Sequence, residues 1–254
     1  MRSHRHDRDA GGSPAVLERK AALRQRIWRR LDVAGIRRFP NPENRIPNFV
    51  GAEQAAERLR DTAPWQRAAT LKANPDSPQW PVRQRALEDG KVLFMAVPRL
   101  AEENPFFLLD PEDLADTPRR ASSIKGASAS ARTVPLAEMS PVDLVVTGCV
   151  AVEESGARLG KGGGFSDLEF ALASAAGLIG PRTMIATTVH EKQVLPTGEI
   201  PMTDHDVPLD WIVTPERTIE CRPGALRRPR GIRWQELTEE KIASIPLLTR
   251  LRRR

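Results

Sequence analysis

The segment Arg158–Asp167, which reads Arg-Leu-Gly-Lys-Gly-Gly-Gly-Phe-Ser-Asp, has residue types suited to binding phosphate. Four of the five residues from 160 to 164 are glycine, so the backbone can adopt positive φ angles and approach a ligand closely. Backbone N–H groups of such a loop can converge on anionic oxygens, and Arg158 and Lys161 add positive charge. The spacing fits neither the P-loop nor the dinucleotide-binding glycine motif, so a flexible turn is the alternative to a phosphate site.

A helix is expected over Leu168–Leu178, directly after this loop. The loop would then present its backbone donors at a helix N-terminus, where the helix dipole also favours an anion. Asp167 lies at the junction, where a carboxylate could hold Mg²⁺ beside a bound phosphate.

A second segment, Pro201–Pro215, is dense in residues that could take part in chemistry, with Asp204, His205 and Asp206 in succession. Two carboxylates could complete a Mg²⁺ site near the phosphate loop, and the imidazole could act as a general acid or base. The alternative is a surface turn in which the aspartates cap backbone N–H groups and the histidine is structural.

The elements that must position these two segments follow an alternating order of strands and helices. Helices are expected over 15–34, 52–63 and 81–89, strands over 91–97, 106–109, 143–150, 182–189 and 210–213, short apolar runs over 67–73 and 218–221, and a loop over 119–134. The succession of strand, glycine loop, helix and strand indicates an open parallel sheet. Since ligands of such sheets bind at the carboxyl ends of the strands, the loop after Val150 and the segment after Val189 should share one rim.

The composition is that of a soluble globular protein. The 254 residues are 40% hydrophobic and 28% charged, and no apolar run approaches the roughly 18 residues of a membrane span. Residues 1–12 lack the apolar core of a secretory signal, so we expect a disordered tail and a cytoplasmic protein. Two cysteines without metal spacing exclude a disulfide framework and a cysteine-based metal site.

The net charge of +6 indicates an anionic partner. It fits an enzyme that handles polyanionic ligands as well as a nucleic-acid-binding protein. Aromatic residues make up only 5% of the chain and tyrosine is absent, so stacking platforms for RNA are not evident and nucleic acid is not favoured.

Taken together, the motifs resemble the 5-formyltetrahydrofolate cyclo-ligase family, also called methenyltetrahydrofolate synthetases. Arg158–Asp167 resembles the family's Arg-Leu-Gly-x-Gly-x-Gly-Tyr-Tyr-Asp motif, and His205–Thr214 resembles its His-Asp-x-Pro-x-Asp segment. Lys20–Arg24 resembles the N-terminal Lys-x-x-Leu-Arg that meets ATP phosphates in the family.

Three further segments resemble a divergent branch, the methenyltetrahydrofolate synthetase domain-containing proteins. They are Ile46–Phe49, Asn74–Arg83 and Met95–Leu100. Relatives in that branch carry an RNA-recognition module, and this sequence has no aromatic segment that resembles one.

The resemblance implies a three-layer α/β/α sandwich with an open, mostly parallel sheet, like those of sugar-phosphate isomerases and CoA-transferases. It places the cyclo-ligase-like domain at 13–225 and leaves a basic C-terminal extension at 226–254. The implied reaction is the ATP-dependent cyclisation of 5-formyltetrahydrofolate to 5,10-methenyltetrahydrofolate, with release of ADP and phosphate. The implied partners are a folate substrate, ATP and Mg²⁺, in a monomer or homodimer.

The resemblance also implies roles for individual residues. Lys161 and Arg158 would be catalytic, and Asp167 and Asp206 would hold Mg²⁺. ATP would be bound by Lys20, Arg24, Arg158, Leu159, Gly160, Lys161, Gly162, Gly163, Gly164, Phe165 and Ser166, and the folate by Lys161, Gly162, Gly163, Gly164 and Phe165.

The sequence departs from the family pattern mainly in the residues that serve folate. Phe165-Ser166 replaces Tyr-Tyr, Leu168 replaces an arginine, and Gln79-Trp80-Pro81 stands where the family has a folate-contacting glutamate. A non-catalytic or repurposed nucleotide- or folate-binding protein is therefore the alternative, with an RNA-associated protein as a third hypothesis.

Overall fold

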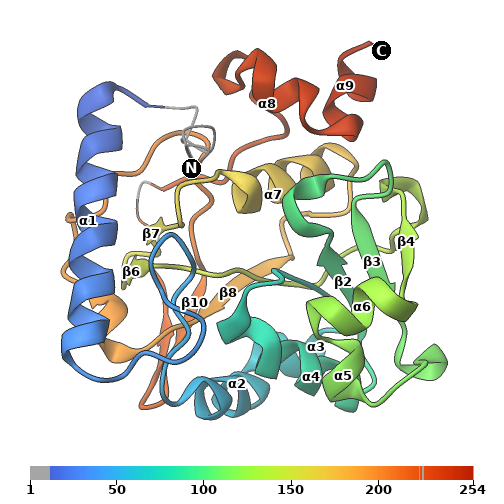
Figure 1. The fold of residues 1–254 in the computed structure, drawn as a ribbon, viewed down its shortest axis with the longest axis horizontal. Coiled ribbons are helices and arrows are strands. Elements are labelled where there is room, and N and C mark those ends of the chain that lie inside the picture. Colours follow the sequence, from blue (N-terminus) through green and yellow to red (C-terminus); the bar gives the residue numbers. More distant parts are fainter. Residues whose placement is uncertain (1–11, 223, 225, 254) are drawn as a thin grey trace.

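The computed structural model describes residues 12–222, 224 and 226–253 (Figure 1). The tail predicted over 1–12 lies outside the described residues apart from Gly12. No helix in the described part of the chain is long and apolar enough to cross a membrane.

An eight-stranded sheet runs through the molecule in the order β11-β10-β8-β5-β1-β2-β3-β4. The central strands β10, β8, β5, β1 and β2 are parallel, whereas β11, β3 and β4 pair antiparallel at the edges. The strands are β1 (Thr70–Ala73), β2 (Val92–Ala96), β3 (Phe106–Leu109), β4 (Arg132–Val134), β5 (Leu144–Val146), β8 (Met184–Thr188), β10 (Trp211–Val213) and β11 (Thr218–Glu220).

A smaller sheet, β7-β6-β9, lies beside the large one and contacts the N-terminal helix. Its strands are β6 (Ala151–Glu153), β7 (Arg158–Leu159) and β9 (Val194–Leu195). Leu23, Ile27 and Leu31 lie on one face of the helix at four-residue spacing and pack against Val150 and Leu159. This packing fixes the helix beside the segment that follows β7.

The helices are α1 (Pro14–Val33), α2 (Ala52–Arg60), α3 (Ala63–Arg67), α4 (Trp80–Glu88), α5 (Pro118–Ala121), α6 (Ile124–Ser130), α7 (Phe165–Ala175), α8 (Glu239–Ala243) and α9 (Pro246–Arg252). Short 3₁₀ turns lie at Ser77–Gln79, Pro98–Leu100, Pro111–Asp113, Leu136–Glu138, Glu191–Gln193 and Trp234–Glu236. The start of α1 is set by Ser13, whose side chain accepts a hydrogen bond from the Val16 N–H, followed by Pro14 in the first turn.

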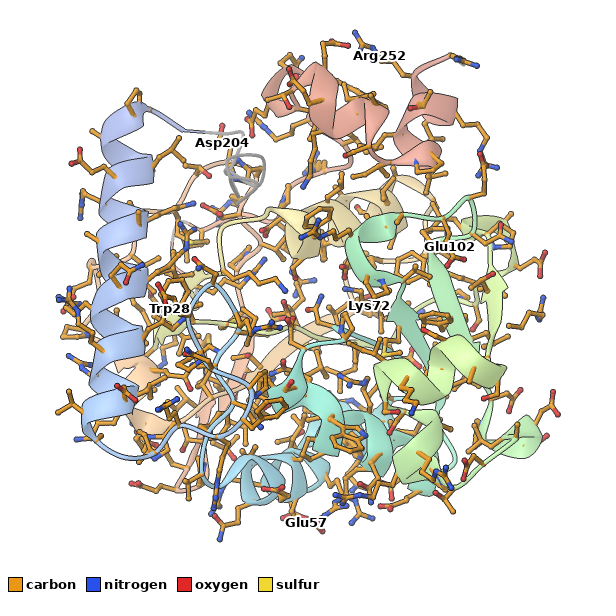
Figure 2. All side chains as sticks on the ribbon, in the orientation of Figure 1. Trp28, Glu57, Lys72, Glu102, Asp204 and Arg252 are labelled. Atoms are coloured by element: carbon orange, nitrogen blue, oxygen red, sulfur yellow. The ribbon has the colours of Figure 1, made fainter. Side chains whose placement is uncertain are left out.

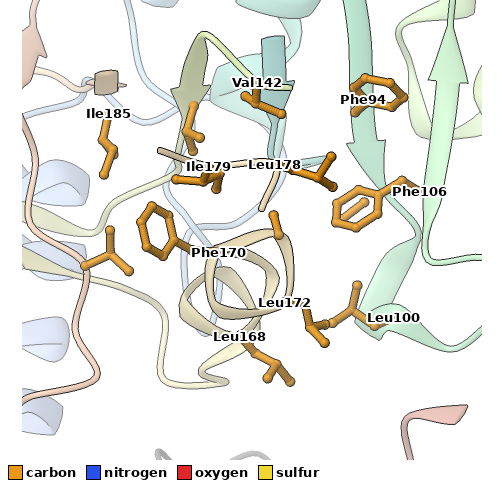
Figure 3. Close-up of a cluster of buried hydrophobic side chains, with 14 of the residues drawn as sticks. Phe94, Leu100, Phe106, Val142, Leu168, Phe170, Leu172, Leu178, Ile179 and Ile185 are labelled. Atoms are coloured by element: carbon orange, nitrogen blue, oxygen red, sulfur yellow. The ribbon is translucent and has the colours of Figure 1, made fainter. Parts of the chain in front are cut away.

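Helices cover both faces of the large sheet (Figure 1). Successive side chains of β2 show the two faces: Phe94 and Ala96 pack with α7, whereas Leu93 and Met95 pack with α2 and α4. Figure 3 shows Phe170 of α7 in the hydrophobic cluster that also contains Phe94 and Ala96, called the main cluster below. The predicted three-layer α/β/α fold with a mostly parallel sheet is confirmed.

Several predicted element bounds were wrong. The strand predicted over 143–150 ends at Val146, and the chain then enters the small sheet before it reaches the glycine loop. The helix predicted from Leu168 begins at Phe165 and ends at Ala175. The region 119–134, predicted to be a loop, contains α6, most of α5 and strand β4.

The C-terminal helices α8 and α9 lie over α7 (Figure 1). Four buried apolar side chains anchor these helices to the main cluster: Ile242, Ile245, Leu247 and Leu248.

Candidate active site

A cavity lined by polar and apolar residues lies at the carboxyl ends of β1 and β5. The chain leaves β1 towards β2 on one side of the sheet and later fills the other side with β5, β8 and β10, so the order reverses between β1 and β5. Ligands of open α/β sheets bind at such a reversal. Asn74 follows β1 and accepts a hydrogen bond at Oδ1 from the N–H of Gly148, which follows β5, at 3.2 Å.

A cavity of about 650 Å³ opens at this point, and the residues predicted for the site meet on its walls. They come from α1, from β7, the start of α7 and the loop between them, and from the segment before β10. The predicted residues that line it are Lys20, Arg24, Arg158, Leu159, Gly160, Lys161, Gly162, Gly163, Gly164, Phe165, Ser166, Asp167 and Asp206.

The glycine loop has a backbone that side chains would disturb. Gly162 has φ 103°, and a Cβ there would lie 3.2 Å from the guanidinium of Arg24. Gly164, with φ 64°, is the N-cap of α7. Within the described residues, nothing accepts a hydrogen bond from the N–H groups of 162–166, so these donors are available to an anion at the helix N-terminus.

Arg158 is the most enclosed basic residue of the loop, with 3% of its surface exposed. Its Nε donates to the Val207 carbonyl at 2.8 Å, and its Nη2 pairs with Asp167 Oδ1. Burial acts to lower the pKa of Arg158, but Asp167 and Asp206 hold it above its usual value. The guanidinium is therefore a permanent positive charge in the cavity wall.

Helix α1 contributes two basic residues one turn apart. Lys20 is 2% exposed and its Nζ lies 2.6 Å from Asp206 Oδ2. The Nε of Arg24 donates to the Gly160 carbonyl at 2.8 Å and so ties the helix to the glycine loop. Burial alone would raise the pKa of Asp206, but Lys20 and Thr203 hold it below its usual value.

The two predicted metal ligands, Asp167 and Asp206, lie on adjoining parts of the cavity wall. Oδ1 of Asp167 accepts from the N–H of Val207 at 3.0 Å, the residue after Asp206. Each carboxylate retains one oxygen that accepts no hydrogen bond from the described residues. Mg²⁺ is commonly held by one or two carboxylates together with phosphate oxygens, so this donor set fits that ion. Among the described residues, no three or more acidic, histidine or cysteine side chains are grouped so that they could hold a metal ion. Phosphate oxygens would therefore have to supply further ligands.

A buried ion pair that the sequence analysis did not identify lies behind the loop. Lys72 of β1 pairs with Glu169 of α7, and both are at least 96% buried. Figure 2 shows Lys72 in the interior of the molecule. Asn74 Nδ2 also donates to Glu169 Oε2 at 2.8 Å, and burial raises the pKa of Glu169 while Lys72 opposes that shift. A lysine inside a short apolar strand was the signal that could have identified this pair.

The hydroxyl of Ser166 is part of the same network. It lies 2.7 Å from the Thr147 hydroxyl and donates to Asn74 Oδ1 at 3.2 Å. Asp76 of the same segment as Asn74 pairs with Lys161 at 2.8 Å. The network therefore connects the ends of β1 and β5 with the start of the glycine-loop helix.

Arg83 of α4 holds the segment that carries Asn74 and Asp76. It is 1% exposed, and its Nη1 donates to the carbonyls of Asn74 at 2.6 Å and Asp76 at 3.1 Å. Burial lowers its pKa to about 10, so it remains charged at neutral pH. This contact gives the motif Asn74–Arg83 a structural role.

His205 contacts Asp206 from outside the cavity wall, with its Nε2 3.7 Å from Oδ1 of Asp206. Its Nδ1 lies 2.7 Å from Oε2 of Glu236, and it is not among the described residues that line the cavity. The structure thus gives the predicted acid–base candidate a carboxylate partner outside the cavity wall.

Comparisons with known proteins give a family and a fold. A family model described as the 5-formyltetrahydrofolate cyclo-ligase family matches residues 16–215. A methenyltetrahydrofolate synthase domain-containing protein of Mus musculus is 39% identical over 239 residues, which are 92% of this chain and 63% of that protein. The 5-formyltetrahydrofolate cyclo-ligase of Mycolicibacterium smegmatis is 33% identical over 86 residues, 34% of this chain and 40% of that protein.

A solved structure has a similar fold at low sequence identity. The NMR structure of Aquifex aeolicus 5,10-methenyltetrahydrofolate synthetase superposes with a TM-score of 0.53 and 19% identity, covering 82% of this chain and 96% of that one. The chain spans about 63% of the length of the mouse relative and of a human relative with the same description.

Proposed function

This chain belongs to the 5-formyltetrahydrofolate cyclo-ligase family, as its motifs predicted, and we propose that it catalyses the ATP-dependent cyclisation of 5-formyltetrahydrofolate to 5,10-methenyltetrahydrofolate. The single observation that carries the proposal is the meeting of Lys20, Arg24, Arg158 and Lys161 with the glycine-loop donors around one cavity. Such a site is built to neutralise and orient a polyphosphate.

In the proposed reaction the formyl oxygen takes the γ-phosphoryl group of ATP and ADP leaves. N10 of the folate then attacks the activated carbon, the ring closes and phosphate is released. Phosphoryl transfer depends on positioning and charge neutralisation more than on covalent help from the protein. Arg158 is held in place by Asp167 and the Val207 carbonyl, so it can meet developing negative charge without rearranging.

We propose that Asp167 and Asp206 hold Mg²⁺ through the carboxylate oxygens not used in hydrogen bonds within the protein. When bound, the ion would neutralise charge on the phosphate oxygens. Lys20 pairs with Asp206 and Arg158 pairs with Asp167, and these contacts would orient the two carboxylates.

A catalytically silent nucleotide- or folate-binding protein is the second candidate. It is favoured by Phe165-Ser166, because the phenyl ring carries no hydroxyl and the Ser166 hydroxyl is already engaged by Thr147 and Asn74. The basic cavity would still bind an anionic ligand in that case.

The test is to incubate the purified chain with 5-formyltetrahydrofolate and Mg-ATP and to follow the absorbance of the methenyl product. Lys161→Met should lower kcat/KM by about 100-fold or more, since it removes a charge that we propose acts on the transferred phosphoryl group. In the structure this lysine pairs with Asp76 at 2.8 Å. Lys192→Met, which changes an exposed lysine outside the cavity, is the matched control and should leave the rate unchanged.

Absence of product above a blank, with Mg-ATP binding demonstrated by a rise in thermal stability, would reject turnover and support the second candidate. A full rate for Lys161→Met would reject the role of that lysine.

A further inference from the structure

A lysine from the C-terminal segment contacts the glycine loop. The family model ends at residue 215, whereas Lys241 lies on α8. Its Nζ donates to the Gly163 carbonyl at 2.8 Å and lies 3.2 Å from the centroid of the Phe165 ring. A residue beyond the matched region is thus in direct contact with the loop proposed to bind ATP.

The ring of Phe165 lies against both the glycine loop and this ammonium group. A Cβ at Gly163 would lie 3.0 Å from Cδ2 of Phe165, so a larger residue at 163 would push the ring away from the loop by a few tenths of an ångström. The ammonium of Lys241 over the ring makes a cation–π contact. Phe165 therefore has a packing partner in this chain that involves no hydroxyl.

The hydrogen bond from Lys241 also fixes the direction of a peptide group. In a planar trans peptide the carbonyl and the following N–H point in opposite directions. With the Gly163 carbonyl held by Lys241, the N–H of Gly164 is directed away from the ammonium group. Within the described residues, no acceptor takes this N–H, so it is one of the donors that an anion could use.

The same C-terminal segment contacts the other half of the site. Glu236 Oε2 lies 2.7 Å from His205 Nδ1, and Arg233 Nη2 lies 3.2 Å from Asp204 Oδ2. The segment thus contacts the two residues that directly precede Asp206. Ile242, next to Lys241, is buried in the main cluster and fixes the position of α8.

From these contacts we propose that Lys241, in the C-terminal segment, is a positioning residue for the glycine loop of the active site. The inference rests on the proposed ATP site, because it assigns Lys241 the task of holding the loop in the conformation that binds phosphate. Lys241 itself does not line the cavity.

The experiment compares Lys241→Met, Lys241→Arg and Glu240→Gln in the full chain. Calorimetric titration should show the Kd for Mg-ATP rising about tenfold for Lys241→Met, the loss expected for one charged hydrogen bond, with the affinity for 5-formyltetrahydrofolate changing less. Lys241→Arg, which keeps the charge and the donor, should restore most of the affinity. Glu240→Gln changes an exposed neighbour on the same helix and should behave as the unmodified chain.

Hydrogen exchange without ligand separates the two proposals. Lys241→Met should speed amide exchange in peptides that span 160–166, whether or not the chain binds ATP. If the unmodified chain binds no Mg-ATP, the proposed function fails while this exchange measurement still tests the positioning role. Unchanged loop exchange, or an unchanged Kd for Mg-ATP in a chain that binds it, would overturn the role of Lys241.

Discussion

Lys20 and Asp206 form a buried ion pair whose loss should be costly. Lys20 is 2% exposed, so Asp206→Asn would leave a buried ammonium without its counter-charge. We expect the free energy of unfolding to fall by on the order of 3 kcal/mol, measured by urea denaturation. Asp204→Asn is the matched control, because that side chain is 81% exposed and its contact with Arg233 is on the surface. Equal stability of both variants would contradict a buried, mutually dependent pair.

The same pair predicts a dependence of stability on pH. The pKa of Asp206 is below its usual value in the folded protein, so the unfolded state takes up the proton first as pH falls. The contribution of the carboxylate is fully present above its unfolded pKa of about 3.9 and is lost as pH falls through the folded pKa. The stability difference between the unmodified chain and Asp206→Asn should therefore stay constant above about pH 5 and shrink as the pH falls below about 4. The other carboxylates are present in both proteins and cancel in this comparison. A stability difference that does not change with pH would contradict the lowered pKa of Asp206.

Among single residues, those close together in a ligand-binding motif could be predicted from the sequence. Buried residues that pair with a distant part of the chain could not. Arg158, Lys161 and Asp167 are close together in the chain, so their common role was visible. Lys72 and Glu169 are 97 positions apart in the chain and meet only because the fold brings β1 and α7 together. No local pattern contains that information.

At the scale of elements, the glycine loop depends on a backbone that alanine cannot adopt freely. Gly162→Ala combines φ 103° with a Cβ 3.2 Å from Arg24, so we expect a loss of about 1–2 kcal/mol in stability. Because Arg24 would be displaced, the Kd for Mg-ATP should also rise, which titration calorimetry would measure. Gly180→Ala is the control, since its φ lies outside the left-handed region and a Cβ there would contact nothing within 4 Å. Comparable ATP binding by both variants would show that the loop conformation is not needed.

The order of elements could be predicted from the sequence, but the point where the chain changes sheets could not. Val145 and Val152 belong to one long apolar stretch, and hydrophobic pattern alone does not show that they lie in different sheets. The helix α6 was missed because Ser, Ala and Gly give little amphipathic signal. Its Gly126 is required by packing, since a Cβ there would lie 1.9 Å from the Arg120 carbonyl.

At the scale of the whole molecule, the site is assembled from distant parts of the chain. The N-terminal helix α1 supplies Lys20, strand β7 supplies Arg158, and α8 contacts Gly163 from outside the region that the family model matches. The fold class could be predicted because the parallel sheet and its glycine loop are local patterns. The contribution of the C-terminal segment could not, because its helices are short and their role depends on what they pack against.

The last prediction is that removal of the C-terminal helices destabilises the whole protein. A variant that ends at residue 231 lacks Ile242, Ile245, Leu247 and Leu248, all buried in the main cluster. Each such side chain contributes about 1.5–3 kcal/mol when fully buried, so their loss is comparable to the net stability of about 5–15 kcal/mol of a typical domain. We expect the variant to bind a hydrophobic dye and to lose a cooperative thermal transition. Arg250→Ser in the full chain, which removes only a surface contact with Glu103, should unfold as the unmodified chain does. A shortened chain with an unchanged melting temperature would show that the sheet and its other helices fold independently of these residues, and that the contacts of α8 serve the site alone.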